Sequence, residues 1–286
     1  MTAHSLAAAR RGSWLPSAPM IGAKFLELRR RRVLTAVTAA FTVGTPVIFY
    51  GIREIYHLSD PARYAPAGNG AFANTVTLIA EFGFIAAVML GATAGTSDLT
   101  DGMFRHLVIT GRSRLALYLA RIPAGLSILL SLAAVGFTVT ALATAFLSGP
   151  EPASVAAALP GDLARSGLWL ELDLAIGFTV GLGLGSLMGQ RTVPVVLLTV
   201  WQIIITPQLA DHVLPHLINA QRIVPGVAMD QLKPAMLAGG VTVGPTGGIQ
   251  PAALPPMPAW AMATVIAGWI LGWLTIGAWK MATRDA

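Results

Sequence analysis

Six stretches of this chain are each long and apolar enough to cross a membrane as a helix. A spanning helix needs ~20 predominantly apolar residues, and within a bilayer it satisfies its own backbone hydrogen bonds. The sequence therefore predicts an all-α integral membrane protein: a mobile tail over residues 1–18 and a single transmembrane domain over residues 19–286. The six predicted transmembrane helices are 33–52, 71–94, 115–147, 168–188, 193–209 and 259–279.

Charged side chains are too few for a soluble protein. They make up 11% of the chain, and hydrophobic side chains make up 55%, whereas a typical soluble domain carries about 25% charged residues. The chain also has no cysteine, which excludes a disulfide framework, cysteine-ligated metal sites and thiol catalysis.

The basic residues lie mainly on one side of the predicted bundle. Fourteen of the nineteen lysines and arginines come before the first span, between spans two and three, between spans four and five, or after the sixth span. Cytoplasmic loops carry the excess of Lys and Arg, so we expect both termini in the cytoplasm and the chain in the cell (plasma) membrane, in contact with the lipid bilayer. The net charge of +6 then reports topology, and nucleic acid is not an expected partner.

The segment before the first span, residues 19–32, is both amphipathic and basic. Ile21, Phe25 and Leu28 fall on one helical face, with Lys24 and four consecutive arginines around it. This pattern predicts an interfacial helix whose apolar face enters the headgroup boundary of the membrane. A positively charged anchor for the first span explains the same residues, and the two interpretations are compatible.

The connection between the second and third spans predicts a second amphipathic helix. Ser97 or Asp98 can cap its start, Asp101 complements its dipole, Gly111 can end it, and Ser113 can cap the helix that follows. The apolar positions at helical spacing are Leu99, Met103, Phe104, Leu107 and Val108. The flanking basic residues are Arg105, Arg112 and Arg114. We interpret the segment as a rigid cytoplasmic element that a partner could push, although the residues alone favour an ordinary connector stabilised by lipid headgroups.

Glycines recur every four residues in the fourth span. Residues at this spacing lie on one helix face, and small side chains there let the backbones of two helices approach closely in lipid. The predicted packing residues are Gly177, Gly181, Gly185 and Gly189.

Ionisable residues inside spans are candidates for function by default. Glu81 near the middle of the second span could line a polar pathway, and a protonated acid bonded to a neighbouring helix is the alternative. Glu171 and Asp173 lie in the outer part of the fourth span, where pairing with Arg165 or snorkelling is the simpler account. The candidate pathway residues are Glu81, Gln202 and Thr206.

The connection over residues 210–258 is expected to form short helices at the outer interface in its first half. It contains His212 and His216, spaced like zinc ligands on a helix. Pro215 separates them and no further ligand is evident, so we expect no metal site.

Common catalytic patterns are also missing from the sequence. No lysine has the glycine and Ser/Thr neighbours of a phosphate-binding loop, and no histidine lies in a span to activate a serine. We therefore expect a non-catalytic chain without a cofactor of its own.

A family resemblance appears after the second span. The sequence there reads Asp98-Leu-Thr-Asp-Gly102-Met103-Phe-Arg105, then Thr110-Gly-Arg112-Ser-Arg114 and Leu117-Tyr-Leu-Ala-Arg121. This order resembles the permease subunits of ABC transporters of the type-2 exporter family, with Asp98 in place of the commoner Glu and Met103 in place of the commoner Thr. The segment from Pro207 to Gly226 is similar to the family's outer helices, and the resemblance covers about Met20 to Lys280.

The resemblance implies half of a transporter. Two such chains, identical or paralogous, would pair around a pathway, and each would dock a separate cytoplasmic ATPase subunit that binds ATP and Mg. The substrate class would be a hydrophobic or amphiphilic drug, natural product or lipid-like compound. The alternative is an ATP-independent secondary carrier or channel in which Glu81 couples ions. The residues that would couple the ATPase are Asp98, Asp101, Gly102, Phe104, Arg105, Arg112 and Arg114.

Overall fold

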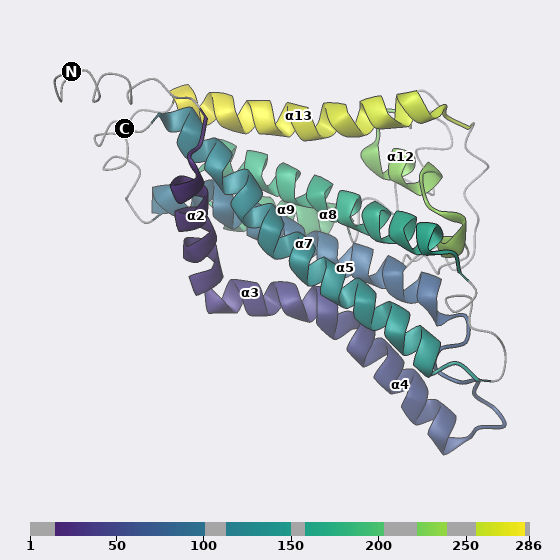
Figure 1. Cartoon of the computed structure of the whole chain (residues 1–286). Helices are drawn as coiled ribbons and strands as arrows, with labels where there is room; N and C mark the ends of the chain where they lie inside the picture. Colours follow the sequence, from purple (N-terminus) through teal and green to yellow (C-terminus); the bar gives the residue numbers. More distant parts are fainter. Residues whose placement is uncertain (1–14, 101–112, 150–157, 203–221, 239–255, 284–286) are drawn as a thin grey trace.

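A computed structural model describes residues 15–100, 113–149, 158–202, 222–238 and 256–283 (Figure 1). Over these ranges the chain is helical and has no strand, as the apolar pattern predicts. Five helices are long and apolar enough to cross a membrane, so the chain has the make-up of a multi-pass membrane protein. These five helices have the bounds Arg32–Ser59, Ala71–Asp98, Arg114–Phe146, Pro160–Met188 and Ala259–Thr283.

The fifth of the six predicted spans, 193–209, is described only in its first part. Helix α9 (Thr192–Val200) begins it, and Trp201 and Gln202 continue it as a π-turn. The rest of this span, the first half of the 210–258 connection and its two histidines lie outside the described residues. The number of six spans and the side on which the termini lie therefore stay predictions.

The first span is interrupted near its middle by a proline. Helix α3 (Arg32–Ala39) passes through a π-turn (Ala40–Gly44) into α4 (Thr45–Ser59). Pro46 has no N–H to donate and its ring displaces the carbonyl four residues earlier, so the helix widens by one residue there and bends. Figure 1 shows α4 leaving the line of α3 and diverging from the other helices.

A short helix precedes the first span and lies across it. Helix α2 (Ala18–Arg30) ends at Arg31, whose backbone has φ −76° and ψ 71°, outside the helical region. The chain turns there, so α2 runs across the ends of the other helices (Figure 1). We call this bend, residues 29–33, the elbow.

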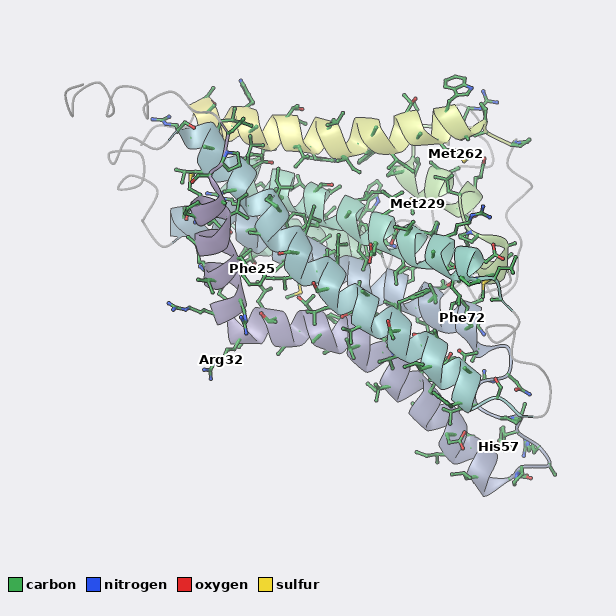
Figure 2. The ribbon with its side chains drawn as sticks, in the orientation of Figure 1. Phe25, Arg32, His57, Phe72, Met229 and Met262 are labelled. Atoms are coloured by element: carbon green, nitrogen blue, oxygen red, sulfur yellow. The ribbon has the colours of Figure 1, made fainter. Side chains whose placement is uncertain are left out.

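The face of α2 that was expected to enter the headgroup region packs on the protein instead. Leu28 is 2% exposed and belongs to the main hydrophobic core, and Ile21 and Phe25 contact the same core (Figure 2). The apolar stripe of α2 is therefore used for tertiary packing on α7 (Arg114–Phe146), which removes its apolar surface from water.

Two central helices pack almost backbone to backbone. They are α5 (Ala71–Thr100) and α8 (Pro160–Met188). A methyl group on Gly181 of α8 would lie 2.5 Å from the carbonyl oxygen of Val88, and one on Gly95 of α5 would lie 2.7 Å from the carbonyl oxygen of Leu182. Side chains larger than hydrogen at these positions would force the two helices apart.

The glycine stripe of α8 divides in two. Gly177, Gly181 and Gly185 face α5, where added methyl groups would meet Phe84, Val88 and Ala92 respectively. Gly189 differs from the prediction because α8 ends before it: its φ of 71° and ψ of 11° are left-handed, and its N–H bonds to the Gly185 carbonyl. Gly189 therefore ends the helix, a position that favours glycine because it has no Cβ.

The remaining helices cover this pair. Helix α13 (Ala259–Thr283) packs on α8, and the short helix α12 (Pro225–Gln231) contributes Met229 to a second core with Met262 of α13 (Figure 2). A 3-10 turn (Ala235–Leu237) follows α12. Helix α7 starts as expected at Ser113, whose Oγ accepts a hydrogen bond of 3.1 Å from the Ala116 N–H; this predicted cap is confirmed.

The glycine contacts predict a position-specific cost of adding one methyl group. Gly181→Ala should lower the free energy of unfolding by about 1–3 kcal/mol because a Cβ must displace the backbone of Val88. Gly268→Ala on α13 is the control, since nothing lies within 4 Å of its added Cβ and alanine favours a helix by up to about 1 kcal/mol. Thermal unfolding of the two purified variants in detergent measures the difference, and equal midpoints would contradict this packing.

Candidate functional site

Asp98 lies in the last described turn of α5 and is only 3% exposed. This corrects the expectation that Ser97 or Asp98 caps a new helix, because α5 continues without a break through Thr100. No glycine or proline occurs between Thr96 and Asp101 to end it. The carboxylate thus projects from α5 into the protein interior.

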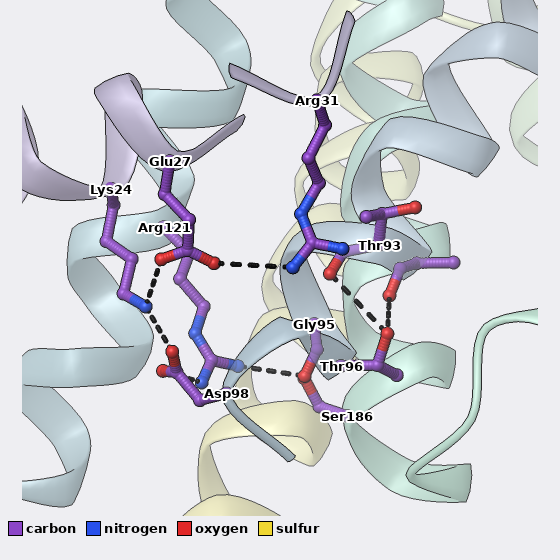
Figure 3. A network of polar contacts seen from close by, with 10 residues as sticks. Lys24, Glu27, Arg31, Thr93, Gly95, Thr96, Asp98, Arg121 and Ser186 are labelled. Carbon is purple, nitrogen blue, oxygen red and sulfur yellow. Dashed lines mark hydrogen bonds and ion pairs between the residues drawn. The ribbon is translucent and has the colours of Figure 1, made fainter. Parts of the chain in front are cut away.

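Two basic side chains from other helices meet this carboxylate (Figure 3). Arg121 of α7 donates from Nη2 to Oδ2 of Asp98 at 2.6 Å, and Lys24 of α2 donates from Nζ to Oδ1 of the same group. Arg121 is 1% exposed and Lys24 8% exposed. One buried carboxylate therefore joins α2, α5 and α7.

The basic partners of Asp98 stabilise its buried negative charge. A buried charge without a partner is costly, so Asp98 by itself is unfavourable at this position. Arg121 neutralises the carboxylate of Asp98 through Nη2, and its Nη1 also donates to the main-chain carbonyl of Gly95 at 2.8 Å. Its Nε has no hydrogen-bond partner among the described residues.

The contacts extend further along α2. Lys24 also donates to Oε2 of Glu27 at 2.7 Å, and Arg31 at the elbow lies 3.8 Å from Oε1 of Glu27. We call Lys24, Glu27, Asp98 and Arg121 the ion-pair network. It contains two basic and two acidic side chains, so it carries no net charge when all four are ionised.

A weaker contact brings α8 to the same place. Ser186 donates from Oγ to the Gly95 carbonyl at 3.4 Å, the same oxygen that accepts from Arg121. Gly95 has no side chain to block this approach, and a methyl group there would lie 3.0 Å from the Ser186 Oγ. The close packing of α5 on α8 and the ion-pair network therefore meet at one residue.

Most of the other predicted coupling residues lie outside the described part of the chain: Asp101, Gly102, Phe104, Arg105 and Arg112. Arg114 is described, and its Nη1 donates to the carbonyl of Ala282 at 3.2 Å. This contact brings the start of α7 beside the last turn of α13 (Figure 1).

Two of the predicted pathway residues, Glu81 and Gln202, belong to a second polar group nearer the start of α5. Gln202 donates from Nε2 to Oε2 of Glu81 at 3.0 Å, which joins α5 to the turn after α9. Asp173 of α8 and Lys233 both interact electrostatically with Glu81. We call Glu81, Asp173, Gln202 and Lys233 the outer polar cluster; Thr206 lies outside the described residues.

Lys233 is held from one side by an aromatic ring. Its Nζ lies 5.7 Å from the centroid of the Trp169 ring, and the Trp169 Nε1 donates to the Met229 carbonyl at 2.8 Å.

The expectation that Arg165 pairs with the acids of the fourth span is wrong, because Arg165 pairs with Asp162 at 3.6 Å, one turn earlier on the exposed start of α8.

Sequence reasoning singled out Asp98 but missed its partners. The prediction places Lys24 around the apolar face of α2. Lys24 instead falls within the stripe of Ile21, Phe25 and Leu28, where a charge must be paired once the stripe is buried. Arg121 lies inside a run that is otherwise apolar, and an arginine at such a position marks a buried partner.

Comparison with known proteins finds no family model and no curated relative that matches this chain.

The ion-pair network predicts an ordered set of stabilities. Asp98→Asn leaves two buried cations without their carboxylate and should lower the free energy of unfolding by about 3–5 kcal/mol. Lys24→Met should cost less, because Asp98 keeps Arg121 and Glu27 keeps Arg31. Asp162→Asn breaks an exposed pair and should cost about 0–1 kcal/mol.

Thermal unfolding in detergent ranks the three variants. If Asp98→Asn unfolds at the same temperature as Asp162→Asn, the carboxylate does not hold the three helices together.

Proposed function

We propose that this chain is the membrane-spanning permease subunit of an ATP-driven exporter of the ABC type-2 family. Two chains would form the pathway, and separate cytoplasmic ATPase subunits would supply ATP and Mg. The substrate class in this proposal is a hydrophobic or amphiphilic compound, such as a drug, a natural product or a lipid-like molecule.

The ion-pair network carries this proposal. In the chain, the proposed coupling segment 101–112 directly follows α5 and precedes α7. Asp98 on α5 is bonded to Arg121 on α7 and to Lys24 on α2. A buried ion pair resists separation because breaking it exposes charges that have no other partner. A push on the coupling segment would therefore move three helices as one body, which is what a motor outside the membrane requires.

The basic residues support the proposed orientation. Arg29, Arg30, Arg31 and Arg32 lie at the elbow, and Arg114, Arg121 and Lys280 lie at the same end of the bundle, where α7 begins beside the last turn of α13. The positive-inside rule makes this end cytoplasmic, so the ATPase would meet α2 and the coupling segment there.

Association with an ATPase is the first test. The full chain, co-expressed with the ABC ATPase subunits of its own organism and purified in detergent, should retain one of them through size-exclusion chromatography. Transport of an amphiphilic dye by the reconstituted complex should then require ATP. Failure of every ATPase to associate, together with dye transport without ATP, would contradict the proposal.

Coupling is the second test. The charge reversals Asp101→Lys and Arg105→Glu should leave the ATPase bound but reduce dye transport per ATP hydrolysed, because the charges that fix the register of the coupling segment are inverted. Asp162→Lys inverts an exposed charge of α8 on the opposite side and is the matched control. An unchanged ratio of transport to hydrolysis in both coupling variants would make the segment an ordinary connector.

The outer polar cluster favours a second candidate function, an ATP-independent carrier or channel. Glu81 lies ten residues into α5, about 15 Å along the helix axis, and hydrogen-bonds Gln202 across to the turn after α9. An acid at this depth can couple an ion to a substrate. In that case the purified chain alone would transport in liposomes under an ion gradient, and Glu81→Gln would abolish the gradient dependence.

A further inference from the structure

The elbow between α2 and α3 gathers four consecutive arginines, of which three are exposed. Arg31 is half-buried and lies near Glu27, whereas Arg29, Arg30 and Arg32 are exposed. Within the described ranges none of these three forms an ion pair. Figure 2 shows Arg32 directed away from the helices. The described part of the protein thus leaves three positive charges at one bend without an ion-pair partner.

Apolar side chains lie beside these charges and are also exposed. The outward face of α2 carries Leu26, which is 49% exposed, and α3 begins with Val33, which is 78% exposed. A shallow groove of about 420 Å³ follows this face of α2 and is lined by Ala23, Leu26, Glu27 and Arg30. The opposite face, with Lys24 and Leu28, is buried against the bundle.

The position of the elbow decides which partner fits this surface. The first apolar span begins at Arg32, so the elbow lies where the hydrocarbon core ends and the headgroup layer begins. A partner there that offers negative charge to the arginines and apolar surface to Leu26 and Val33 is an anionic phospholipid. Guanidinium groups bind phosphate through paired hydrogen bonds, and acyl chains cover exposed apolar side chains at this depth.

We propose that the elbow is a binding site for anionic phospholipids, with Arg29, Arg30 and Arg32 contacting the headgroup phosphate and Leu26 and Val33 contacting the acyl chains. The site sets the position of α2. Arg31 joins the elbow to Glu27, and Glu27 joins Lys24 of the ion-pair network, so a lipid bound at the elbow steadies the helix that carries Lys24. This inference does not depend on the assignment as an exporter.

The test measures how lipid charge affects the full-length protein. The chain is reconstituted in nanodiscs of phosphatidylcholine, with or without phosphatidylglycerol, and its unfolding temperature and retained lipids are measured by calorimetry and native mass spectrometry. Phosphatidylglycerol should raise the unfolding temperature and be retained in preference to phosphatidylcholine. High salt should reduce the shift, because exposed charges are screened.

Charge-removal variants locate the site. The elbow variant combines Arg29→Gln, Arg30→Gln and Arg32→Gln. The control removes three exposed charges elsewhere and combines Arg63→Gln, Arg165→Gln and Arg222→Gln. Each elbow arginine removed should weaken retention of phosphatidylglycerol by about fivefold, and the control should retain it as the unchanged chain does. A third variant with lysine at the three elbow positions keeps the charge and should restore most of the preference.

Two results would overturn the proposal. One is an elbow variant that retains phosphatidylglycerol and shifts its unfolding temperature as the control does. The other is an equal rise in unfolding temperature when glycerol phosphate is added to the detergent-solubilised chain, which would mean that the arginines bind a free phosphate and need no lipid. No shift with glycerol phosphate, together with loss of the lipid effect in the elbow variant alone, supports the lipid site.

Discussion

The buried contact between Asp98 and Arg121 constrains more of this molecule than any other side-chain interaction in its described part. In a membrane protein there is little water to solvate a separated charge, so each partner fixes where the other can lie. Arg121 reaches both the carboxylate and the Gly95 carbonyl, which holds α7 against the end of α5. Lys24 then fixes α2 to the same carboxylate. The crossing of α2 over the bundle follows from one acid with two basic partners.

The central pair of helices complements this constraint. The apolar contact between α5 and α8 depends on hydrogen in place of a side chain at Gly91, Gly95, Gly181 and Gly185, and it gains dispersion energy from close approach. These glycine contacts are distributed along the two helices and do not distinguish one end of the bundle from the other. The ion-pair network, by contrast, lies at the end of the bundle that carries the elbow, and the outer polar cluster lies nearer the start of α5. Close packing holds the centre together, and polar contacts distinguish the two ends.

Five long apolar helices, the Ser113 cap and the face of α8 that carries Gly177, Gly181 and Gly185 could be predicted because each depends on residues near one another in the chain. The partners of Asp98 could not, because Lys24 is 74 residues away and Arg121 is 23 residues away, and nothing local specifies which helices meet. The side of α2 that faces the protein differs from the prediction for a related reason. An apolar stripe looks the same whether lipid or another helix covers it, and only a buried lysine within the stripe indicates a neighbouring acid.

The ion-pair network carries no net charge, and this determines how membrane voltage acts on it. A charge moved through a membrane potential gains or loses about 2.3 kcal/mol for every 100 mV. Lys24, Glu27, Asp98 and Arg121 together contribute two positive and two negative charges, so displacing them as a body does no net electrical work. Membrane voltage therefore gives no direct drive to a displacement of these four side chains. The energy for displacing them must come from a source other than the voltage, such as the binding of a partner.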